Sequence, residues 1–297
     1  MASLRELRRK VKSVKSTQQI TKAMKMVSAA RLRRAQGRIL SARPFAQKME
    51  TLLTDIFSAV AEPGQSGAAV RTVLGHPLLA ERKTGPRGLV LITADKGLCG
   101  SFNTNLIKRG LEFLRENEGE TVELFCVGRK GRDFFRRMKV AVRGEYVNIF
   151  NQLSYAHAEL IGRDVTDFFV NRPARDVTVI YNEFKSVMQQ RPVRSVWLPL
   201  TPPVPASVRP AAPDFLYEPA RERLLESLFP RALKAQIFRA LMESAAAELA
   251  ARMTAMENAT RNAKELIESL TLYANKLRQA AITKEISELV GGAEALQ

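Results

Sequence analysis

The sequence contains few of the residues that most enzymes use for chemistry at neutral pH. Of its 297 residues, only Cys99 and Cys126 are cysteine, and only His76 and His157 are histidine. Two cysteines make neither a disulfide scaffold nor a four-cysteine zinc site, which favours a reduced cytoplasmic setting. Isolated histidines are usually hydrogen-bonded surface or core residues. The sequence therefore predicts no catalytic residue, no metal site and no cofactor.

Long apolar runs are also absent. No stretch of eighteen apolar residues occurs, so no direct membrane span is predicted. The first residues are rich in arginine, contain serine and have almost no acid, as mitochondrial transit peptides do. The same character continues past residue 40 without a cleavage signal. We therefore interpret this segment as part of the mature protein.

Residues 1–43 lack proline and aromatic residues, and Gly37 is their only glycine. They carry thirteen Lys or Arg against the single acid Glu6, a net charge of +12. The spacing of the apolar residues predicts one helix from Ser3 to about residue 60. The apolar positions in its first forty residues are Leu4, Leu7, Val11, Val14, Ile20, Met24, Val27, Leu32 and Ile39.

The other end of the chain has no proline after Pro230. Small and apolar residues there recur alternately four and three positions apart, which is a heptad pattern held over five repeats. They are Met242, Ala246, Leu249, Met253, Met256, Thr260, Ala263, Ile267, Leu270, Ala274, Leu277 and Ala281. Residues 219–290 would span roughly 105 Å as a helix and residues 3–58 roughly 80 Å. Because both apolar seams need a partner, we expect an antiparallel coiled coil of the two terminal helices.

The residues between these helices alternate between strand and helix patterns. Apolar runs at 88–93, 121–127 and 177–181 predict buried strands, and a last strand is expected within 189–200. Amphipathic helices are expected at 103–117, 129–138 and 154–171. Such alternation favours a largely parallel, Rossmann-like sheet. The predicted fold is thus a mixed α+β and α/β one, with an α/β domain inserted into a coiled coil.

Four segments follow from these patterns. They are an N-terminal coiled-coil helix at 1–60, an α/β domain at 70–200, a proline-rich linker at 201–218 and a C-terminal coiled-coil helix at 219–297.

The loop Ala94-Asp-Lys-Gly-Leu-Cys-Gly-Ser101 lies between a predicted strand and a predicted helix, where phosphate loops also lie. It lacks the spacing of a Walker A motif and of the dinucleotide fingerprint. We interpret it as a tight turn with Gly97 and Gly100 at special backbone angles. An anion site at Asp95 and Lys96, or an enzyme that uses Cys99, is the alternative.

The net charge of +17 and the isoelectric point near 10.3 imply an acidic partner. Residues 231–297 hold nine Lys or Arg and eight Glu, so the excess charge is concentrated on the N-terminal helix. Nucleic-acid binding is one interpretation. No aromatic residue is interleaved to stack on bases, and one face of the helix is needed for the coiled coil.

Three motifs resemble those of the gamma subunits of F-type ATP synthases. They are Thr17-Gln-Gln-Ile-Thr-Lys-Ala-Met-Lys-Met-Val27, the Gly-Leu-Cys-Gly loop, and Arg278-Gln-Ala-Ala-Ile-Thr-Lys-Glu-Ile-Ser-Glu288 followed by Gly292-Ala293. The resemblance covers the whole chain, and the three motifs occur in the family's order. It implies a central rotor shaft inside a ring of alpha and beta subunits. It also implies that the α/β domain is a foot that contacts the epsilon subunit and the c-ring. The delta subunit would belong to the same complex, and no nucleic-acid partner is implied.

The resemblance also implies contact residues and a location. By position, Met24 and Lys25 would face the acidic lever segment of beta. Polar contacts to beta loops would come from Arg252, Gln279, Thr283 and Glu285. The missing chloroplast-type cysteine insert, together with the absence of a transit peptide, favours a bacterial protein. Its expected place is peripheral, on the cytoplasmic face of the plasma membrane.

Overall fold

The computed structural model describes residues 4–60, 75–201 and 221–294. Two long helices, α1 (Leu4–Val60) and α6 (Arg221–Glu294), are the first and last elements of the chain, and all other elements lie between them in sequence. The strands are β1 (Arg87–Ile92), β2 (Val122–Val127), β3 (Val142–Tyr146), β4 (Asp176–Phe184) and β5 (Gln190–Leu198). The helices between them are η1 (Pro77–Leu79), α3 (Phe102–Glu116), α4 (Arg129–Arg137), η2 (Ile149–Asn151) and α5 (Tyr155–Asn171).

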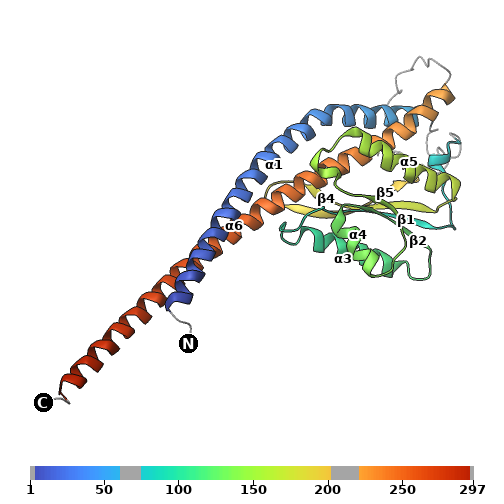
Figure 1. Cartoon of the computed structure of the whole chain (residues 1–297). Helices are drawn as coiled ribbons and strands as arrows, with labels where there is room; N and C mark the ends of the chain where they lie inside the picture. Colours follow the sequence, from blue (N-terminus) through green and yellow to red (C-terminus); the bar gives the residue numbers. More distant parts are fainter. Residues whose placement is uncertain (1–3, 61–74, 202–220, 295–297) are drawn as a thin grey trace. The chain divides into compact units, whose positions relative to one another are not determined.

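Both predicted terminal helices are confirmed, and each runs through an internal proline, Pro44 in α1 and Pro230 in α6. Glycine and proline, the main breakers of helices, are few in both: α1 contains only Gly37 and Pro44, and α6 contains Pro230 and, near its end, Gly291 and Gly292. Figure 1 shows α1 and α6 side by side. The predicted start of the first helix, Ser3, lies outside the described residues.

The five strands form one sheet in the order β3-β2-β1-β4-β5. β1 pairs in parallel with β2 and β4, β2 pairs in parallel with β3, and β4 and β5 form an antiparallel pair. The predicted largely parallel sheet is therefore confirmed, as are the expected strands and the three expected helices. One strand, β3, was not predicted. Its sequence Val-Arg-Gly-Glu-Tyr is short and two of its five residues are charged, which suits an edge strand but gives no apolar run.

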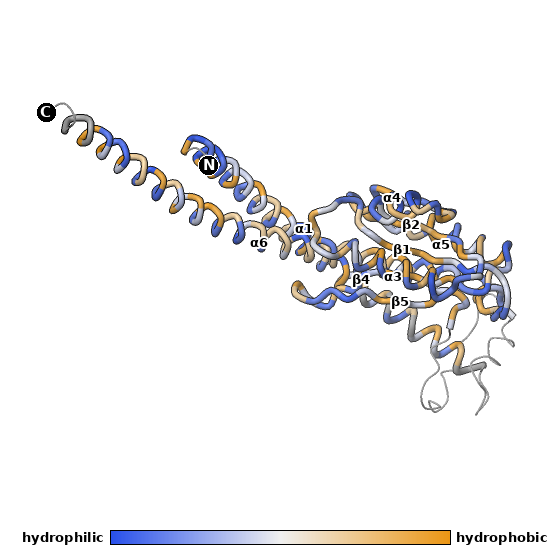
Figure 2. Tube along the Cα trace, turned by 90° about the horizontal axis from the view of Figure 1, so that it is seen from below, coloured by the Kyte–Doolittle hydropathy of each residue, from blue (hydrophilic) through white to orange (hydrophobic). Residues whose placement is uncertain are grey.

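The sheet separates two hydrophobic layers, and strand β1 contributes side chains to both of them. Leu89 and Leu91 point to the layer beneath α3 and α4, whereas Val90 and Ile92 point to the layer that contains α5, α6 and the end of α1. This arrangement explains why β1 is apolar at nearly every position rather than at alternate ones. Figure 2 shows the strand largely in orange.

The chain divides into two compact units. Unit 1 comprises residues 1–30 and 252–297, and unit 2 comprises residues 31–251. Unit 2 therefore contains the sheet together with a part of each terminal helix, and Leu32 of α1 packs there with Ala246 and Ala250 of α6. The predicted linker, 201–218, lies outside the described residues apart from Thr201.

The observed architecture confirms the predicted fold class, which is a pair of long terminal helices with an inserted, mostly parallel α/β sheet. Among the described residues, no helix is both long enough and apolar enough to cross a bilayer.

Candidate functional site

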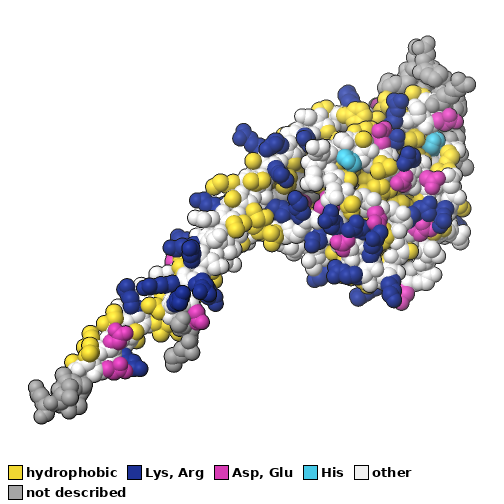
Figure 3. Space-filling model, viewed as in Figure 1, with side chains coloured by type: hydrophobic (Ala, Val, Ile, Leu, Met, Phe, Trp, Pro, Cys, Tyr) yellow, Lys and Arg dark blue, Asp and Glu magenta, His cyan; other side chains and the backbone are white. Residues whose placement is uncertain are grey.

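Unit 1 is an antiparallel pair of helices, formed by residues 4–30 of α1 and residues 252–294 of α6. The direction follows from two contacts, because Thr21 meets Thr260 while Lys25 meets Glu257. On α6 the less exposed positions follow the predicted heptads from Met253 to Leu277. Figure 3 shows Lys and Arg side chains gathered along this pair.

On α1 the seam is more polar than the sequence analysis predicted. The less exposed positions are alternately three and four residues apart and include Leu4, Leu7, Val11, Val14, Gln18, Thr21, Lys25 and Ser28. The prediction placed Ile20 and Val27 in the seam, and it was wrong for both. Their side chains are 58% and 53% exposed. The heptad continues without a break, but its middle positions are occupied by polar residues. A search for apolar spacing therefore assigned the wrong residues to the seam in this part of α1.

Two hydroxyl groups meet inside the seam. The Oγ1 atoms of Thr21 and Thr260 lie 2.8 Å apart, and Thr21 is buried. Each hydroxyl is also within hydrogen-bond distance of a carbonyl of its own helix, at Gln18 or at Met256. Each hydroxyl has a single proton, so one threonine donates across the seam while the other donates to its own helix. A polar pair of this kind favours one axial register, because a shifted register would break the hydrogen bond across the seam and leave each hydroxyl only the carbonyl of its own helix.

One turn further along α1, Lys25 Nζ donates to Glu257 Oε1 at 2.8 Å. This hydrogen bond, together with the charge of Lys25, lowers the pKa of Glu257. Both side chains are more than a third exposed, so the pair orients the helices more than it stabilises them. The neighbouring Met24 is half-buried. Within the isolated chain, Lys25 therefore makes an interhelical contact.

The last part of α6 has no comparable cover. Every residue from Arg278 to Val290 is exposed. Gln279, Thr283 and Glu285 all lie on this section, and the Thr283 hydroxyl donates to the carbonyl of Gln279 at 2.9 Å. Arg252, at the other end of unit 1, is half-buried. The six predicted contact residues thus lie in three places along unit 1: Met24 and Lys25 on α1, Arg252 at one end of the α6 section, and Gln279, Thr283 and Glu285 on its exposed part.

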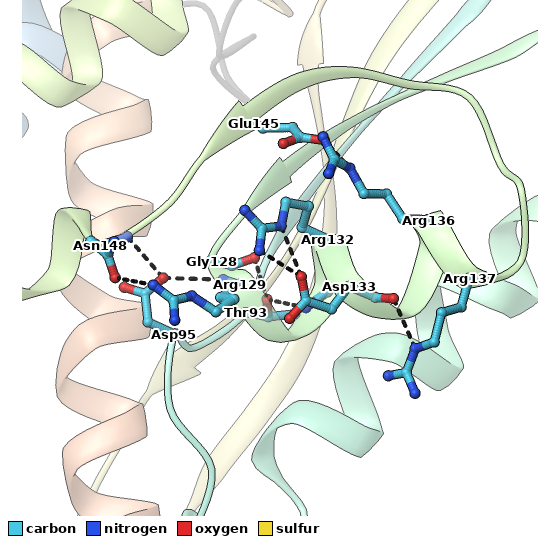
Figure 4. Close-up of polar contacts among 11 residues, drawn as sticks. Thr93, Asp95, Gly128, Arg129, Arg132, Asp133, Arg136, Arg137, Glu145 and Asn148 are labelled. Carbon is cyan, nitrogen blue, oxygen red and sulfur yellow. Dashed lines mark hydrogen bonds and ion pairs between the residues drawn. The ribbon is translucent and has the colours of Figure 1, made fainter.

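The loop after β1 lies in unit 2 and is held by its own carboxylate. Asp95 Oδ1 accepts hydrogen bonds from the backbone N–H of Arg129 at 3.1 Å and of Asn148 at 2.9 Å (Figure 4). Arg129 opens α4, so the carboxylate occupies the positive end of that helix. In many α/β proteins a ligand phosphate takes this place. Here Asp95 already satisfies the donors, which supports the interpretation of the loop as a structural turn.

The other residues of this loop fit the same interpretation, with one correction. Gly100 has a positive φ of 58°, as predicted, but the second such residue is Leu98, with φ 63°, and not Gly97. The Cys99 side chain is 1% exposed, and its Sγ accepts a hydrogen bond from Asn103. A buried thiol of this kind does not suit the alternative in which Cys99 acts as a nucleophile.

The surroundings of Cys126 and of the two histidines also favour structural roles for these residues. Burial raises the pKa of the Cys126 thiol to about 12. His76 Nδ1 accepts from the backbone N–H of Leu78, and burial lowers the pKa of that imidazole. His157 Nδ1 accepts from the backbone N–H of Ser154 in a capping box at the start of α5. These contacts match the sequence interpretation of both histidines as hydrogen-bonded residues.

Comparison with known proteins covers nearly the entire chain. The family model described as ATP synthase matches residues 3–296. The ATP synthase gamma chain of an Anaeromyxobacter species is 48% identical, and that of Solibacter usitatus is 46% identical, each over all of both chains. The chain belongs to the ATP synthase gamma-chain family. The resemblance noted from the three motifs is therefore confirmed.

A solved structure agrees with this membership. The central stalk and c-ring structure of the Tetrahymena thermophila mitochondrial ATP synthase contains a chain that is 27% identical, with a TM-score of 0.60. The match covers 81% of this chain and 99% of the Tetrahymena chain. Membership in the gamma-chain family also directs attention to unit 1, where the sequence analysis missed Gln18, Thr21 and Ser28 as seam residues. The available signal for them was their position in the unbroken heptad of α1. Glu257 was missed as well, and it lies beside the heptad positions of α6 rather than on them.

Proposed function

We propose that this chain is the central rotor shaft of an F-type ATP synthase and lies inside a ring of three alpha and three beta subunits. Ion flow through the c-ring turns the shaft, and the turning shaft drives each beta subunit through its conformational cycle. The observation that carries this proposal is the full-length relation to gamma chains. The antiparallel pair in unit 1, with its fixed register, supports it, because an axle must transmit torque without slipping.

The chain itself is proposed to be non-catalytic, with ATP made or hydrolysed at alpha–beta interfaces. The groups that a catalyst would need are engaged elsewhere: Asp95 holds the start of α4, and Cys99 is buried. These contacts, together with the gamma-chain relationship, favour a mechanical role over nucleic-acid binding and over an enzyme built on the loop. No cofactor is proposed.

The proposed work is divided among four segments. Residues 1–60 and 219–297 form the shaft, residues 70–200 form the foot that contacts epsilon and the c-ring, and residues 201–218 link foot to shaft. Delta belongs to the same complex without touching the shaft. The location that suits these partners is the cytoplasmic face of a bacterial inner membrane, with the chain held there by its partners.

The proposed contacts with the surrounding ring are made by Met24, Lys25, Arg252, Gln279, Thr283 and Glu285. Each contact should be weak, because a shaft that bound tightly at one angle would stop there. Lys25 has two roles in this scheme. Its ammonium group has three donors, so it can keep Glu257 as a partner while it donates to an acidic beta segment.

Native purification tests the assembly directly. The chain carrying an affinity tag is expressed in its own source cells and recovered from membranes, and the proteins that elute with it are identified by mass spectrometry. We expect alpha, beta and epsilon subunits in fixed proportion. Recovery of the chain without alpha and beta would overturn the proposal.

The contact residues are tested with a matched pair of threonines. Thr283 and Thr271 are both exposed on α6, and each hydroxyl donates to the carbonyl four residues earlier. We expect Thr283→Val to lower ATP-driven proton pumping in membrane vesicles by about twofold to fivefold, in line with a single weak contact. Thr271→Val should leave pumping unchanged. Equal effects of the two changes would argue against a specific contact at Thr283.

A further inference from the structure

Glu257 is an isolated negative charge in unit 1. On α6 it is the only acid between Glu248 and Glu265. Residues 11–30 of α1 contain four lysines and no acid, and the nearest acids along that helix are Glu6 and Glu50. Side chains on one helix meet only when they are three or four residues apart. A carboxylate that compensates one of these lysines within unit 1 therefore has to come from α6.

Glu257 contacts one of the four lysines. The Nζ atom of Lys25 lies 2.8 Å from Oε1 of Glu257. The contact between the hydroxyls of Thr21 and Thr260 lies about one helical turn away and favours the register that brings Lys25 and Glu257 together. The hydrogen bond from Lys25 lowers the pKa of Glu257, so this carboxyl group is charged at neutral pH. Lys25 thus has a compensating negative charge beside it.

Lys22 shows that such compensation is not general along α1. It lies three residues before Lys25, is exposed, and forms no ion pair with any residue that the structure describes. The positive charge of Lys22 is therefore fully available to a partner. The lysine that family resemblance assigns to an acidic segment of beta is thus one that already has an acidic neighbour within the chain.

The pair is open to a partner from outside. The side chain of Lys25 is 38% exposed and that of Glu257 is 46% exposed. The ammonium group of a lysine has three donors, so Lys25 keeps donors that Glu257 does not use. Exposed ion pairs are weak and screened by salt. Glu257 therefore reduces the charge that Lys25 presents without blocking its approach to a second carboxylate.

We propose that Glu257 is a positioning residue that limits how strongly Lys25 binds an acidic partner segment. The proposal rests on the proposed function, in which Lys25 faces such a segment of beta. The partner carboxylate has to share the ammonium group with a carboxylate that is already in place. A contact that is made and broken at every turn of the shaft needs such a limit, because tight binding at one angle would stop rotation.

A double-mutant cycle in the complete complex tests this role. Vesicles carry wild type, Glu257→Gln, Lys25→Gln or both changes, and ATP-driven proton pumping is measured. Glu257→Gln leaves Lys25 uncompensated and should lower pumping about twofold to fivefold, the size of one exposed ion pair. Lys25→Gln removes the contact itself and should lower pumping less. The double variant should pump like Lys25→Gln and therefore faster than Glu257→Gln.

A purely structural role predicts a different pattern. Each single change breaks the same hydrogen bond between the helices, so equal losses in all three variants would overturn the proposal. Pumping at the wild-type rate by Glu257→Gln would also overturn it. If Glu257→Gln does not assemble, Glu257→Asp replaces it. That change keeps the charge but shortens the reach, and its smaller loss should again be relieved by Lys25→Gln.

Salt gives a readout that a packing defect would not change. Raising the ionic strength from about 0.01 M to about 0.15 M shortens the screening length from about 30 Å to about 8 Å. The deficit of Glu257→Gln should therefore shrink as salt is added, because an uncompensated lysine grips its partner less tightly when it is screened. A deficit that does not depend on salt would contradict the assigned role.

Two control changes separate this pair from the overall charge of unit 1. Glu265→Gln removes another exposed acid from α6 and should leave pumping unchanged. Lys22→Gln removes a cation that Glu257 does not contact, so it should not restore pumping in Glu257→Gln. Restoration by Lys22→Gln would assign the effect to total charge and overturn the role of the pair.

The subunit content of the same vesicles distinguishes the two proposals. Absence of alpha and beta from the purified complex would overturn the rotor function itself. With alpha and beta present, equal losses in the three variants of the cycle would overturn only the role of Glu257.

Discussion

The ammonium group of Lys25 lies 2.8 Å from a carboxylate oxygen of Glu257, and this contact joins two helices from opposite ends of the chain. The sequence resemblance assigned Lys25 to a partner subunit, but in this chain its nearest acidic contact is internal. The charge that Lys25 presents to a partner is therefore partly compensated by Glu257.

The Lys25–Glu257 contact should make the stability of unit 1 depend on pH. Glu257 has a folded-state pKa below its ordinary value of 4.5, so its contribution is present above that value. It is lost as the pH falls through the lowered pKa. Thermal melts followed by circular dichroism should show Glu257→Gln less stable than wild type at pH 7, with the difference shrinking as the pH is lowered below 4.5. The exposed Glu265→Gln serves as a control, and a similar pH-dependent loss in that variant would contradict the assignment.

The hydroxyl pair should appear in a double-mutant cycle. Thr21→Val or Thr260→Val alone should lower the free energy of unfolding by about 1 kcal/mol, because each leaves a partly buried hydroxyl facing a methyl group. The double Val variant should recover most of that loss. Urea denaturation of the full chain measures all four proteins. Strictly additive losses in the double variant would show that the two hydroxyls do not interact.

The carboxylate of Asp95 should be needed to hold α4 in place. Asp95→Ala removes the acceptor for the backbone N–H groups of Arg129 and Asn148 and should cost about 1–2 kcal/mol of stability, as loss of an N-terminal cap does. Asp95→Asn keeps an acceptor oxygen and should cost less. Denaturant unfolding provides the comparison. A neutral effect of Asp95→Ala would return the loop to consideration as an anion site.

Gly128 should tolerate no side chain. Its φ is +93°, and a Cβ there would lie 2.1 Å from the carbonyl oxygen of Thr93. Gly119 has a similar φ of +96° with nothing within 4 Å of a Cβ. Gly119→Ala should therefore cost about 1–3 kcal/mol of backbone strain. Gly128→Ala should cost more, to the point of poor folding, and similar melting temperatures for the two variants would contradict this.

The seam of α6 should be required for coupling. Leu270→Pro breaks the helix within the paired section at a cost of about 3 kcal/mol or more. We expect ATP synthesis driven by a proton gradient to be abolished in membrane vesicles that carry this variant. Assays of alpha and beta subunits without the shaft show whether the catalytic sites remain intact. Normal synthesis by Leu270→Pro would contradict a shaft that transmits load.

The sequence predicted most of the fold because its signals were strong. Long segments with few helix breakers indicated α1 and α6, and nearly uniform apolar runs indicated β1 and β2. Strand β3 was missed because an edge strand with Gly144 and alternating charges carries no such signal. The seam of α1 was misplaced at Ile20 and Val27 because polar residues take the heptad positions between Val14 and Leu32.

The candidate contacts with partner subunits followed from family resemblance. The packing of the two helices adds the contacts within the chain, which the resemblance did not give. Lys25 was assigned a partner outside the chain, yet its partner inside the chain could be found only from the register of the two helices. That register depends on contacts between residues far apart in the sequence, which no local pattern records.

Thr21 and Thr260 are separated by 239 positions, so the first of them leaves the ribosome long before the second exists. At about 5–20 residues per second, α1 waits on the order of 10–50 seconds for its partner. During that interval a threonine, a lysine and a serine in the middle of its seam are exposed to water rather than apolar side chains. The thirteen cations in the first 43 residues repel other nascent chains. The polar seam thus keeps an unpaired helix soluble during synthesis and selects its register once the last residues arrive.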